Sequence, residues 1–186
     1  MPAGEIPTGA MIEMRVSRLV TDPFSNLPVV VLDDGVGIEI AIGIGVNEAP
    51  AIASELNNIE MQRPIAHDLI KTIVGQCGAR VEAVELRDVR KETFYATLVL
   101  RIGGARVEVD ARPSDAIAVA LRTRARIHVA QKVLDKTRRG AAPRTRDPQQ
   151  QLDFLSEPEE TGPIRALDAA WLLEALRDED FGKWKM

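Results

Sequence analysis

The sequence contains a single cysteine, and it has neither a long hydrophobic run nor a signal pattern. Cys77 alone excludes an internal disulfide framework and is typical of a reducing compartment. No run approaches the ~18 apolar residues that a membrane-spanning helix needs. The opening MPAGEIPTGA lacks the basic and apolar regions of a secretory signal. We therefore expect a cytoplasmic protein with no membrane partner.

Aromatic residues are also scarce, at 4% of a chain of 186 residues. The core must therefore be built mainly from Val, Ile, Leu and Ala. No glycine-rich loop is followed by Lys-Ser/Thr, and no Ser–His–Asp or Cys–His arrangement stands out, so neither a P-loop NTPase nor a triad hydrolase is indicated. Apolar residues at 45% and charged residues at 28% are typical of a globular protein with one domain and a tail.

Short alternating segments and turn signals predict the secondary structure. Strands are expected at residues 12–20, 28–32, 37–45, 81–89, 93–102, 106–110 and 126–130, and helices at residues 47–57, 64–76, 113–122 and 131–138. Hairpin signals such as Asp33–Gly35 and Gly103-Gly104 dominate the connections. The sequence therefore predicts an α+β fold, with one compact domain over residues 11–139, a mainly antiparallel sheet and about four helices.

The end of the chain has a different composition. Residues 140–163 contain four prolines together with Gly and Gln, which is typical of a linker. Residues 164–186 are expected to form a short C-terminal helical tail. Its aromatic residues, Trp171, Phe181 and Trp184, suggest docking onto the domain or onto a partner that the sequence does not identify.

Charge is distributed unevenly. The net charge of −4 argues against a dedicated nucleic-acid binder. Residues 122–146 nevertheless contain nine basic residues and one acidic residue, with Arg138 and Arg139 among the basic ones. Such a block is typical of contact with a polyanion, but it also fits a solvated face or a contact with the acidic tail.

The segment VEVDARPSDAIAVAL, residues 107–121, changes from an alternating strand to an apolar helix. Pro113 suits the first helical position, and a carboxylate at Asp115 suits the first turn. Helix capping alone does not account for Asp110 and Arg112 beside Glu108, although ion pairs among these residues would explain the pattern without a functional site. Carboxylates this close together are candidate ligands for a divalent metal, and an arginine at a helix start is a candidate phosphate contact.

A second helix start has a similar pattern, RPIAHDLI, residues 63–70. Arg63 precedes a proline, and His67 and Asp68 follow in the first turns. His67 is a candidate general acid or base, although a surface histidine, or one bonded to a carboxylate, explains the pattern equally well. A site is indicated if the first turns of the two helices meet in an open cleft. A buried Arg112 bound to Asp68 or Asp110 would favour a structural role.

Three blocks, RPIAHDLI, ETFYATLVL and VDARPSDAIAVAL, resemble the bifunctional nuclease domain family in order and spacing over about residues 11–135. The resemblance implies a compact α+β domain, usually oligomeric, that degrades RNA and DNA. The tail segment LLEALRDEDFGKW is similar to half of a helical-hairpin module that excinuclease subunits share. The polar positions that lie within matching blocks are Arg63, His67, Asp68, Asp110, Arg112, Ser114 and Asp115.

The leading interpretation is a nuclease that cleaves phosphodiester bonds in RNA or DNA as a homo-oligomer, a dimer or higher. The expected catalytic residues are His67, Asp68, Asp110 and Asp115. The expected substrate-binding residues are Arg63, Arg112, Ser114, Arg138 and Arg139. The expected ligands of Mg²⁺ or Mn²⁺ are Asp110, Asp115 and Glu108. The alternative is a non-catalytic oligomeric binding or regulatory module for nucleic acid, a nucleotide or a protein.

Overall fold

The structure is a computed structural model, and it describes residues 9–91 and 93–140, with the side chains of residues 139 and 140 excluded. The strands are β1 (Met11–Thr21), β2 (Pro28–Asp33), β3 (Glu39–Gly43), β4 (Ala79–Arg90), β5 (Thr93–Ile102), β6 (Ala105–Ala111) and β7 (Arg126–Ala130). The helices are α1 (Ala49–Leu56), α2 (Ala66–Gln76), α3 (Pro113–Thr123) and α4 (Gln131–Gly140). Each described element lies where the sequence predicted it, within a few residues.

All seven strands form one sheet, in the order β3-β2-β1-β7-β4-β5-β6. Neighbouring strands are antiparallel except for β4 and β7, which are parallel because α3 crosses over between β6 and β7. The predicted α+β fold with a mainly antiparallel sheet is confirmed. Strand β6 pairs with β5 alone and is one of the two edges of the sheet.

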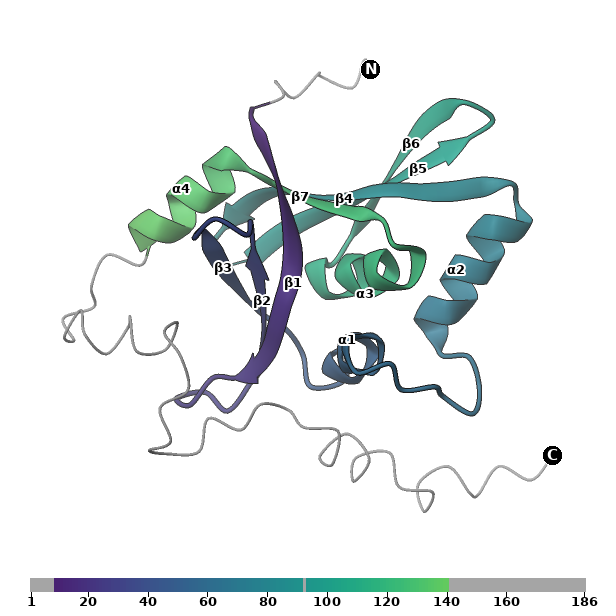
Figure 1. Ribbon diagram of the computed structural model, residues 1–186. Helices are drawn as coiled ribbons and strands as arrows, with labels where there is room; N and C mark the ends of the chain where they lie inside the picture. Colours follow the sequence, from purple (N-terminus) through teal and green to yellow (C-terminus); the bar gives the residue numbers. More distant parts are fainter. Residues whose placement is uncertain (1–8, 92, 141–186) are drawn as a thin grey trace.

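The helices are arranged around this sheet as Figure 1 shows. Helix α3 lies against the middle of the sheet, α1 lies beyond it, and α2 and α4 lie at opposite ends. The core contains aliphatic side chains almost exclusively, as the scarcity of aromatic residues requires. Ile117 and Val119 of α3 belong to the same buried cluster as the strand residues Leu86 and Leu98. Burial of this aliphatic surface supplies most of the folding free energy.

Helix α3 begins as its sequence predicts. Arg112 is the N-cap residue, with extended backbone angles of φ −67° and ψ 145°. Pro113 occupies the first helical turn, where its missing N–H costs no hydrogen bond. Asp115 lies in the same turn, near the positive end of the helix dipole. The strand-to-helix junction therefore presents Arg112 and Asp115 at a fixed position.

The starts of α1 and α2 differ from the prediction in detail. Helix α1 has Glu48, not Asn47, as its N-cap residue. Helix α2 begins at Ala66 rather than Pro64, and the carboxylate of Asp68 accepts a hydrogen bond from the N–H of Ile65 at 2.9 Å. Gly78 has the predicted positive φ, +68°, directly after α2.

The linker predicted over residues 140–163 lies outside the described residues except for Gly140, which ends α4. The helical tail predicted at 164–186 lies wholly outside them. Within the described part of the chain, every helix is too short or too polar to cross a membrane.

Candidate functional site

Three helix starts meet at one cluster of polar side chains. Nε of Arg112 donates to Oδ2 of Asp115 at 2.6 Å, and Nη1 of Arg112 donates to Oε1 of Glu48 at 2.8 Å. On the other side of the same carboxylate, Nε2 of His67 lies 3.2 Å from Oδ1 of Asp115. The first turns of α2 and α3 therefore approach each other, as a site requires. Glu48 joins them from α1.

Exposure differs sharply among these four residues. The side chain of His67 is 12% exposed and that of Asp115 is 29% exposed, whereas that of Arg112 is 66% exposed. Arg112 is therefore not the buried, purely structural arginine of the alternative interpretation. Its guanidinium faces solvent while two carboxylates hold its orientation, so it presents a positive group at a defined place.

The carboxylate of Asp115 is kept ionised by its neighbours. Burial alone would raise its pKa, but the hydrogen bonds from Arg112 and His67 and the positive charge of Arg112 outweigh burial and lower the pKa below its usual value. Hydrogen bonding to Asp115 in turn raises the pKa of Arg112. Asp115 is therefore an anion at neutral pH, and it binds the imidazole and the guanidinium together.

Only one ring nitrogen of His67 makes a hydrogen bond to the described residues. Nε2 faces Asp115, while Nδ1 is buried and has no hydrogen-bond partner among the described residues. If Nε2 carries the proton, it donates to Asp115 and leaves Nδ1 as a free base, the tautomer that a neighbouring carboxylate favours. A buried ring nitrogen normally has a hydrogen-bond partner, so Nδ1 is a candidate position for a bound proton donor.

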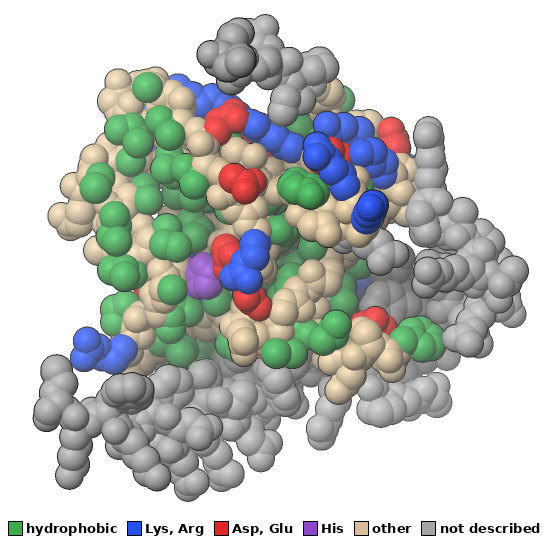
Figure 2. Space-filling view, turned by 180° about the vertical axis from the view of Figure 1, so that it is seen from behind, with side chains coloured by type: hydrophobic (Ala, Val, Ile, Leu, Met, Phe, Trp, Pro, Cys, Tyr) green, Lys and Arg blue, Asp and Glu red, His purple; other side chains and the backbone are tan. Residues whose placement is uncertain are grey.

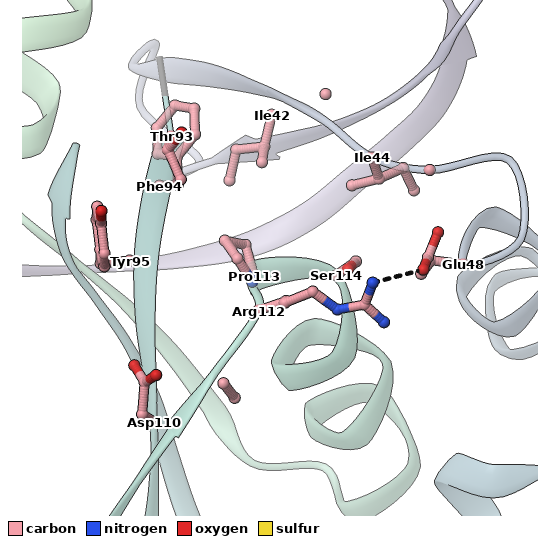
Figure 3. A pocket seen from close by; sticks show the side chains of 13 residues that line it. Ile42, Ile44, Glu48, Thr93, Phe94, Tyr95, Asp110, Arg112, Pro113 and Ser114 are labelled. Carbon is pink, nitrogen blue, oxygen red and sulfur yellow. Dashed lines mark hydrogen bonds and ion pairs between the residues drawn. The ribbon is translucent and has the colours of Figure 1, made fainter. Parts of the chain in front are cut away.

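A pocket of about 490 Å³ opens beside Arg112. Figure 3 shows Arg112 reaching across to Glu48, while the Asp110 carboxylate is turned away from the guanidinium. Phe94 and Tyr95 from β5 line the same pocket, and so does the buried Ser114 of α3. The pocket thus combines a guanidinium, two carboxylates and two aromatic side chains near the C-terminal end of β6.

Asp68 lies in a different environment from its neighbour His67. Its Oδ1 accepts a hydrogen bond from Nε of Arg122 at 2.7 Å, and Arg122 is 2% exposed. Burial raises the pKa of Asp68. The hydrogen bonds from Ile65 and Arg122 lower it by more than burial raises it, so the pKa lies below its usual value. Asp68 therefore ties α2 to α3, and its carboxylate bonds Arg122 rather than His67 or Arg112.

Arg63 lies in a second pocket, of about 470 Å³, which Asp68 and Arg122 also line. The two arginines that precede prolines thus lie at separate pockets, because the pocket of Arg112 is lined by β3, β5 and the β6–α3 junction. A single phosphate between Arg63 and Arg112 is not indicated by this arrangement.

Glu108 belongs to an ion-pair network on the sheet surface. Its two carboxylate oxygens accept hydrogen bonds from Arg87, and Arg106 donates to one of them at 3.2 Å. Within residues 9–91 and 93–140, no three His, Cys, Asp or Glu side chains are grouped so as to hold a metal ion. Glu108, Asp110 and Asp115 have separate surroundings in this conformation.

The basic residues of the segment 122–146 that the structure describes also lie in different surroundings. Arg122 is buried, and Nζ of Lys136 lies 2.6 Å from Oδ1 of Asp88. Arg138 is exposed on α4, at the end of the sheet opposite α2 in Figure 1. The side chain of Arg139 lies outside the described part of the structure.

Sequence reasoning missed Glu48 as a member of the site. The available signal was an acidic residue just before a helix start, in GVNEAP. Its carboxylate lies so close to Gly45 that a Cβ built on Gly45 would overlap Oε2 of Glu48. A glycine at this position therefore leaves the space that the Glu48 carboxylate occupies.

The chain is similar to one known domain family and to curated proteins of other organisms. The family model described as the bifunctional nuclease domain matches residues 30–141. An uncharacterized protein of Mycobacterium tuberculosis is 38% identical over 125 residues, which are 67% of this chain and 74% of the relative. Bifunctional nuclease 1 of Arabidopsis thaliana is 29% identical over 146 residues, which are 68% of this chain and 45% of the plant protein. The chain thus spans less than half of that plant relative.

Proposed function

The chain belongs to the bifunctional nuclease domain family, and on this premise we propose that it hydrolyses phosphodiester bonds in RNA and DNA at the cluster around Arg112. One observation carries the proposal: an exposed guanidinium is fixed by Asp115 and Glu48 at the mouth of a pocket, with His67 on the far side of Asp115. The family and its plant relatives named bifunctional nucleases support a nuclease-type function.

Each residue of the cluster has a proposed role. Arg112 contacts a phosphate oxygen and offsets the negative charge that develops there during hydrolysis. Asp115 orients both Arg112 and His67, and His67 moves the proton of the attacking water or of the leaving oxygen. Asp110 and Ser114 face the pocket and contact the substrate beside the scissile bond.

A phosphate must compete for Arg112, because two carboxylates already bind it. The bond to Glu48 is a single hydrogen bond, whereas Asp115 accepts two, at 2.6 and 3.2 Å. Displacing Glu48 therefore costs less than displacing Asp115. We infer that substrate binding releases Glu48 and leaves the Arg112–Asp115 pair intact.

Divalent-metal assistance by Mg²⁺ or Mn²⁺ is a separate part of the proposal. The expected ligands Asp110, Asp115 and Glu108 do not converge within the described residues, so the roles given above are independent of a metal. If a metal takes part, Asp110 and Asp115 are its candidate ligands near the pocket. The metal would polarise the phosphate and lower the pKa of a bound water.

The surroundings of the site contribute in less specific ways. The exposed Arg138 and its neighbour Arg139 would add attraction to the nucleic-acid backbone that is independent of sequence. A free and exposed thiol at Cys77 supports a reducing, cytoplasmic location. Homo-oligomeric assembly is also proposed.

The decisive experiment measures cleavage of labelled RNA and single-stranded DNA by highly purified wild type and by Arg112→Ala, Asp115→Asn and His67→Gln. Each reaction is run with Mg²⁺, with Mn²⁺ and with EDTA, and each variant is checked by circular dichroism and thermal melting. Loss of at least about a hundredfold in rate in each folded variant is expected. Wild-type rates in all three folded variants would overturn the assignment of the site.

A second candidate function is a non-catalytic binding or regulatory module. It is favoured by the same ion pairs, since Arg112 with two carboxylates also fastens α1 to α3 as a structural tie. In that case the three substitutions would lower thermal stability together, and purified wild type would bind RNA without cleaving it.

A further inference from the structure

Tyr95 is an exposed aromatic side chain beside the pocket of Arg112, in a protein that has few aromatic residues. It is 42% exposed and lines that pocket. Cζ of Arg90 lies over the Tyr95 ring, 5.1 Å from its centroid, and Nε of Arg90 donates a hydrogen bond to Oδ2 of Asp88 at 2.9 Å. The guanidinium therefore lies against one face of the ring and helps to hold its orientation. Tyr95 thus offers a flat apolar surface at the pocket before any ligand binds.

Asp110 is a neighbour of Tyr95 on the same face of the sheet. It pairs with Thr97 of β5, and Tyr95 lies two residues before Thr97 on that strand. Because side chains alternate along a strand, Asp110 and Tyr95 point to the same side, as diagonal neighbours about 7–8 Å apart. Figure 3 shows both side chains on the same side of Arg112. An aromatic ring and a carboxylate therefore lie next to each other at the pocket.

The carboxylate of Asp110 has no hydrogen-bond or ion-pair partner among the residues that the structure describes, and Figure 3 draws no bond from it to the other side chains of the pocket. The carboxylates near it on this face are those of Glu85, Asp88 and Glu108, and each of them bonds two basic side chains. Asp110 is exposed and lines the pocket. Its two oxygens are thus available to a ligand, whereas those of its neighbours already bind the protein itself.

A carboxylate beside an aromatic ring is a chemical match for a nucleobase. Proteins bind single-stranded nucleic acid by stacking its bases on aromatic side chains and by hydrogen bonding to the base edges. On its Watson–Crick edge, guanine places two neighbouring donors, N1–H and the 2-amino group, which match the two acceptor oxygens of one carboxylate. Adenine and cytosine place one amino donor beside an unprotonated ring nitrogen, and uracil places one N–H between two carbonyl oxygens. An ionised carboxylate therefore favours guanine.

We propose that Tyr95 and Asp110 form a guanine-binding subsite, in which the base stacks on Tyr95 and donates two hydrogen bonds to Asp110. The proposal rests on the proposed function, since Arg112 holds a phosphate beside the bound base. Arg112 follows Asp110 by two residues and lines the same pocket, so the contacts to phosphate and to base come from adjoining positions. A base stacked on Tyr95 has left any double helix, so the subsite selects single-stranded RNA or DNA.

Exposed basic side chains lie near the subsite. Arg90 contacts the Tyr95 ring, and its side chain is 69% exposed. Figure 2 shows a mixed group of His, basic and acidic side chains near the middle of one face of the molecule, and Lys and Arg side chains gathered above it toward the rim. The phosphates of a strand that extends beyond the bound guanine would therefore meet cationic groups.

The first test measures base preference by fluorescence anisotropy with the full chain. The probes are single-stranded oligomers of uridine with 2′-O-methyl riboses and phosphorothioate links, which resist cleavage, and they carry G, A, C or U at one central position. Wild type is expected to bind the guanine oligomer at least about fivefold more tightly than the other three, the discrimination expected of one bidentate pair. Equal affinities for the four oligomers would overturn the proposal.

Asp110→Asn tests the hydrogen bonds to the base. Its amide has donor and acceptor atoms side by side, which match the amino group and the ring nitrogen of adenine, so the preference should move from guanine to adenine. Glu60→Gln is the control, because Glu60 is exposed, lines the separate pocket of Arg63 and loses the same charge. This control should keep the guanine preference. A guanine preference that survives in Asp110→Asn would exclude Asp110 as the residue that contacts the base.

Tyr95→Leu tests the stacking. Loss of the ring should weaken binding of the guanine oligomer at least about fivefold, whereas Tyr95→Phe, which keeps a ring, should restore most of the affinity. Equal affinities of these two variants, both shown by circular dichroism to be folded, would contradict stacking on Tyr95.

The three measurements follow binding rather than cleavage, so they separate the subsite from the proposed function. Guanine preference in a chain that cleaves neither RNA nor DNA would support the subsite and overturn the nuclease. Cleavage that depends on Arg112, without any base preference, would support the nuclease and overturn the subsite.

Discussion

Arg122 and Asp68 join α3 to α2 by an ion pair, with Nε of Arg122 2.7 Å from Oδ1 of Asp68. The same guanidinium donates to the carbonyl oxygens of Ala51 and Ala118 at 2.7 and 3.0 Å. Three helices are therefore fastened by one buried cation. The starts of these same helices carry His67, Arg112 and Glu48. The bonds of Arg122 therefore help to hold the residues of the candidate site in their relative positions.

Arg122→Ala should consequently destabilise the fold. Its removal takes away the hydrogen bonds to the carbonyl oxygens of Ala51 and Ala118 and deprives the Asp68 carboxylate of its cationic partner. Because Asp68 keeps some contact with water, we expect a loss of about 3 kcal/mol in the free energy of unfolding, at the lower end of the range for a broken buried pair. Urea denaturation monitored by circular dichroism measures it.

The matched control for this prediction is Arg126→Ala. Its side chain is 72% exposed and lies 3.9 Å from Glu13, so the free energy of unfolding should change by less than about 0.5 kcal/mol. Equal losses in the two variants would show that the bonds made by Arg122 contribute little to stability.

The fold could be predicted from sequence because its signals are local. Alternation in β5, the Gly103-Gly104 hairpin and the proline at the start of α3 each indicate one element without reference to the rest of the chain. The parallel pairing of β4 with β7 was not specified by any such signal. It depends on where α3 returns the chain, which only the packing of α3 on the sheet decides.

The candidate site was predictable only in part, because local signals mark the helix starts but do not say which side chains meet in the fold. The meeting of His67 with Asp115 follows from two helix starts that the sequence marked, but their contact spans 48 residues of chain. The partners of Arg112 could not be chosen from spacing, since Asp68 and Asp110 were equally charged candidates and the carboxylate of Glu48 lies far away in the sequence. The structure pairs Asp68 with Arg122 instead, because burying Arg122 requires an anion close by.

Glu108 provides a pH-dependent prediction. Hydrogen bonds from Arg87, assisted by Arg106, lower its pKa from 4.5 to about 2. Since the folded-state pKa lies below the ordinary value, the ionised carboxylate stabilises the folded state. This contribution is complete above pH 4.5 and is lost as the pH falls through about 2. Glu108→Gln should therefore lower the free energy of unfolding at pH 7, and the difference from wild type should shrink below pH 4.5.

Urea titrations at several pH values between neutral and acidic conditions test this expectation. Glu13→Gln is the control, because its carboxylate is 61% exposed and its two basic neighbours, Arg126 and His128, lie 3.9 Å away. A difference between Glu108→Gln and wild type that stays constant down to pH 3 would contradict the stabilising role of the ionised Glu108.

The exposed basic residues of α4 lead to a prediction about salt. If Lys132 and Arg138 contact the backbone of a nucleic acid, each releases counterions on binding, so log K falls with log salt. The double variant Lys132→Ala and Arg138→Ala should lower the slope by about 1.4–1.8, the value for two contacts. Fluorescence anisotropy with labelled RNA and DNA measures it. An unchanged slope would remove α4 from the interface, and Arg15→Ala, on β1, serves as the control.

The competition between Glu48 and phosphate for Arg112 leads to the most specific prediction. Glu48→Gln removes a negative charge that holds Nη1 of Arg112, so the guanidinium becomes available to phosphate. Affinity for an RNA that cannot be cleaved should rise by about 1.5- to fivefold, a gain of the size expected for one exposed ion pair. Weaker binding instead would show that Glu48, rather than Arg112, contacts the substrate.

Gly45→Ala tests the same competition without removing a charge. The new methyl group would overlap Oε2 of Glu48, and because that atom ends a flexible side chain, the carboxylate should rotate away from Arg112 at little cost to the fold. RNA affinity should then rise as it does in Glu48→Gln. Gly43→Ala, where a Cβ meets nothing within 4 Å, should leave affinity unchanged. Since both glycines lie close together before α1, a rise confined to Gly45→Ala would trace the effect to the Glu48 carboxylate and not to stiffening of the chain.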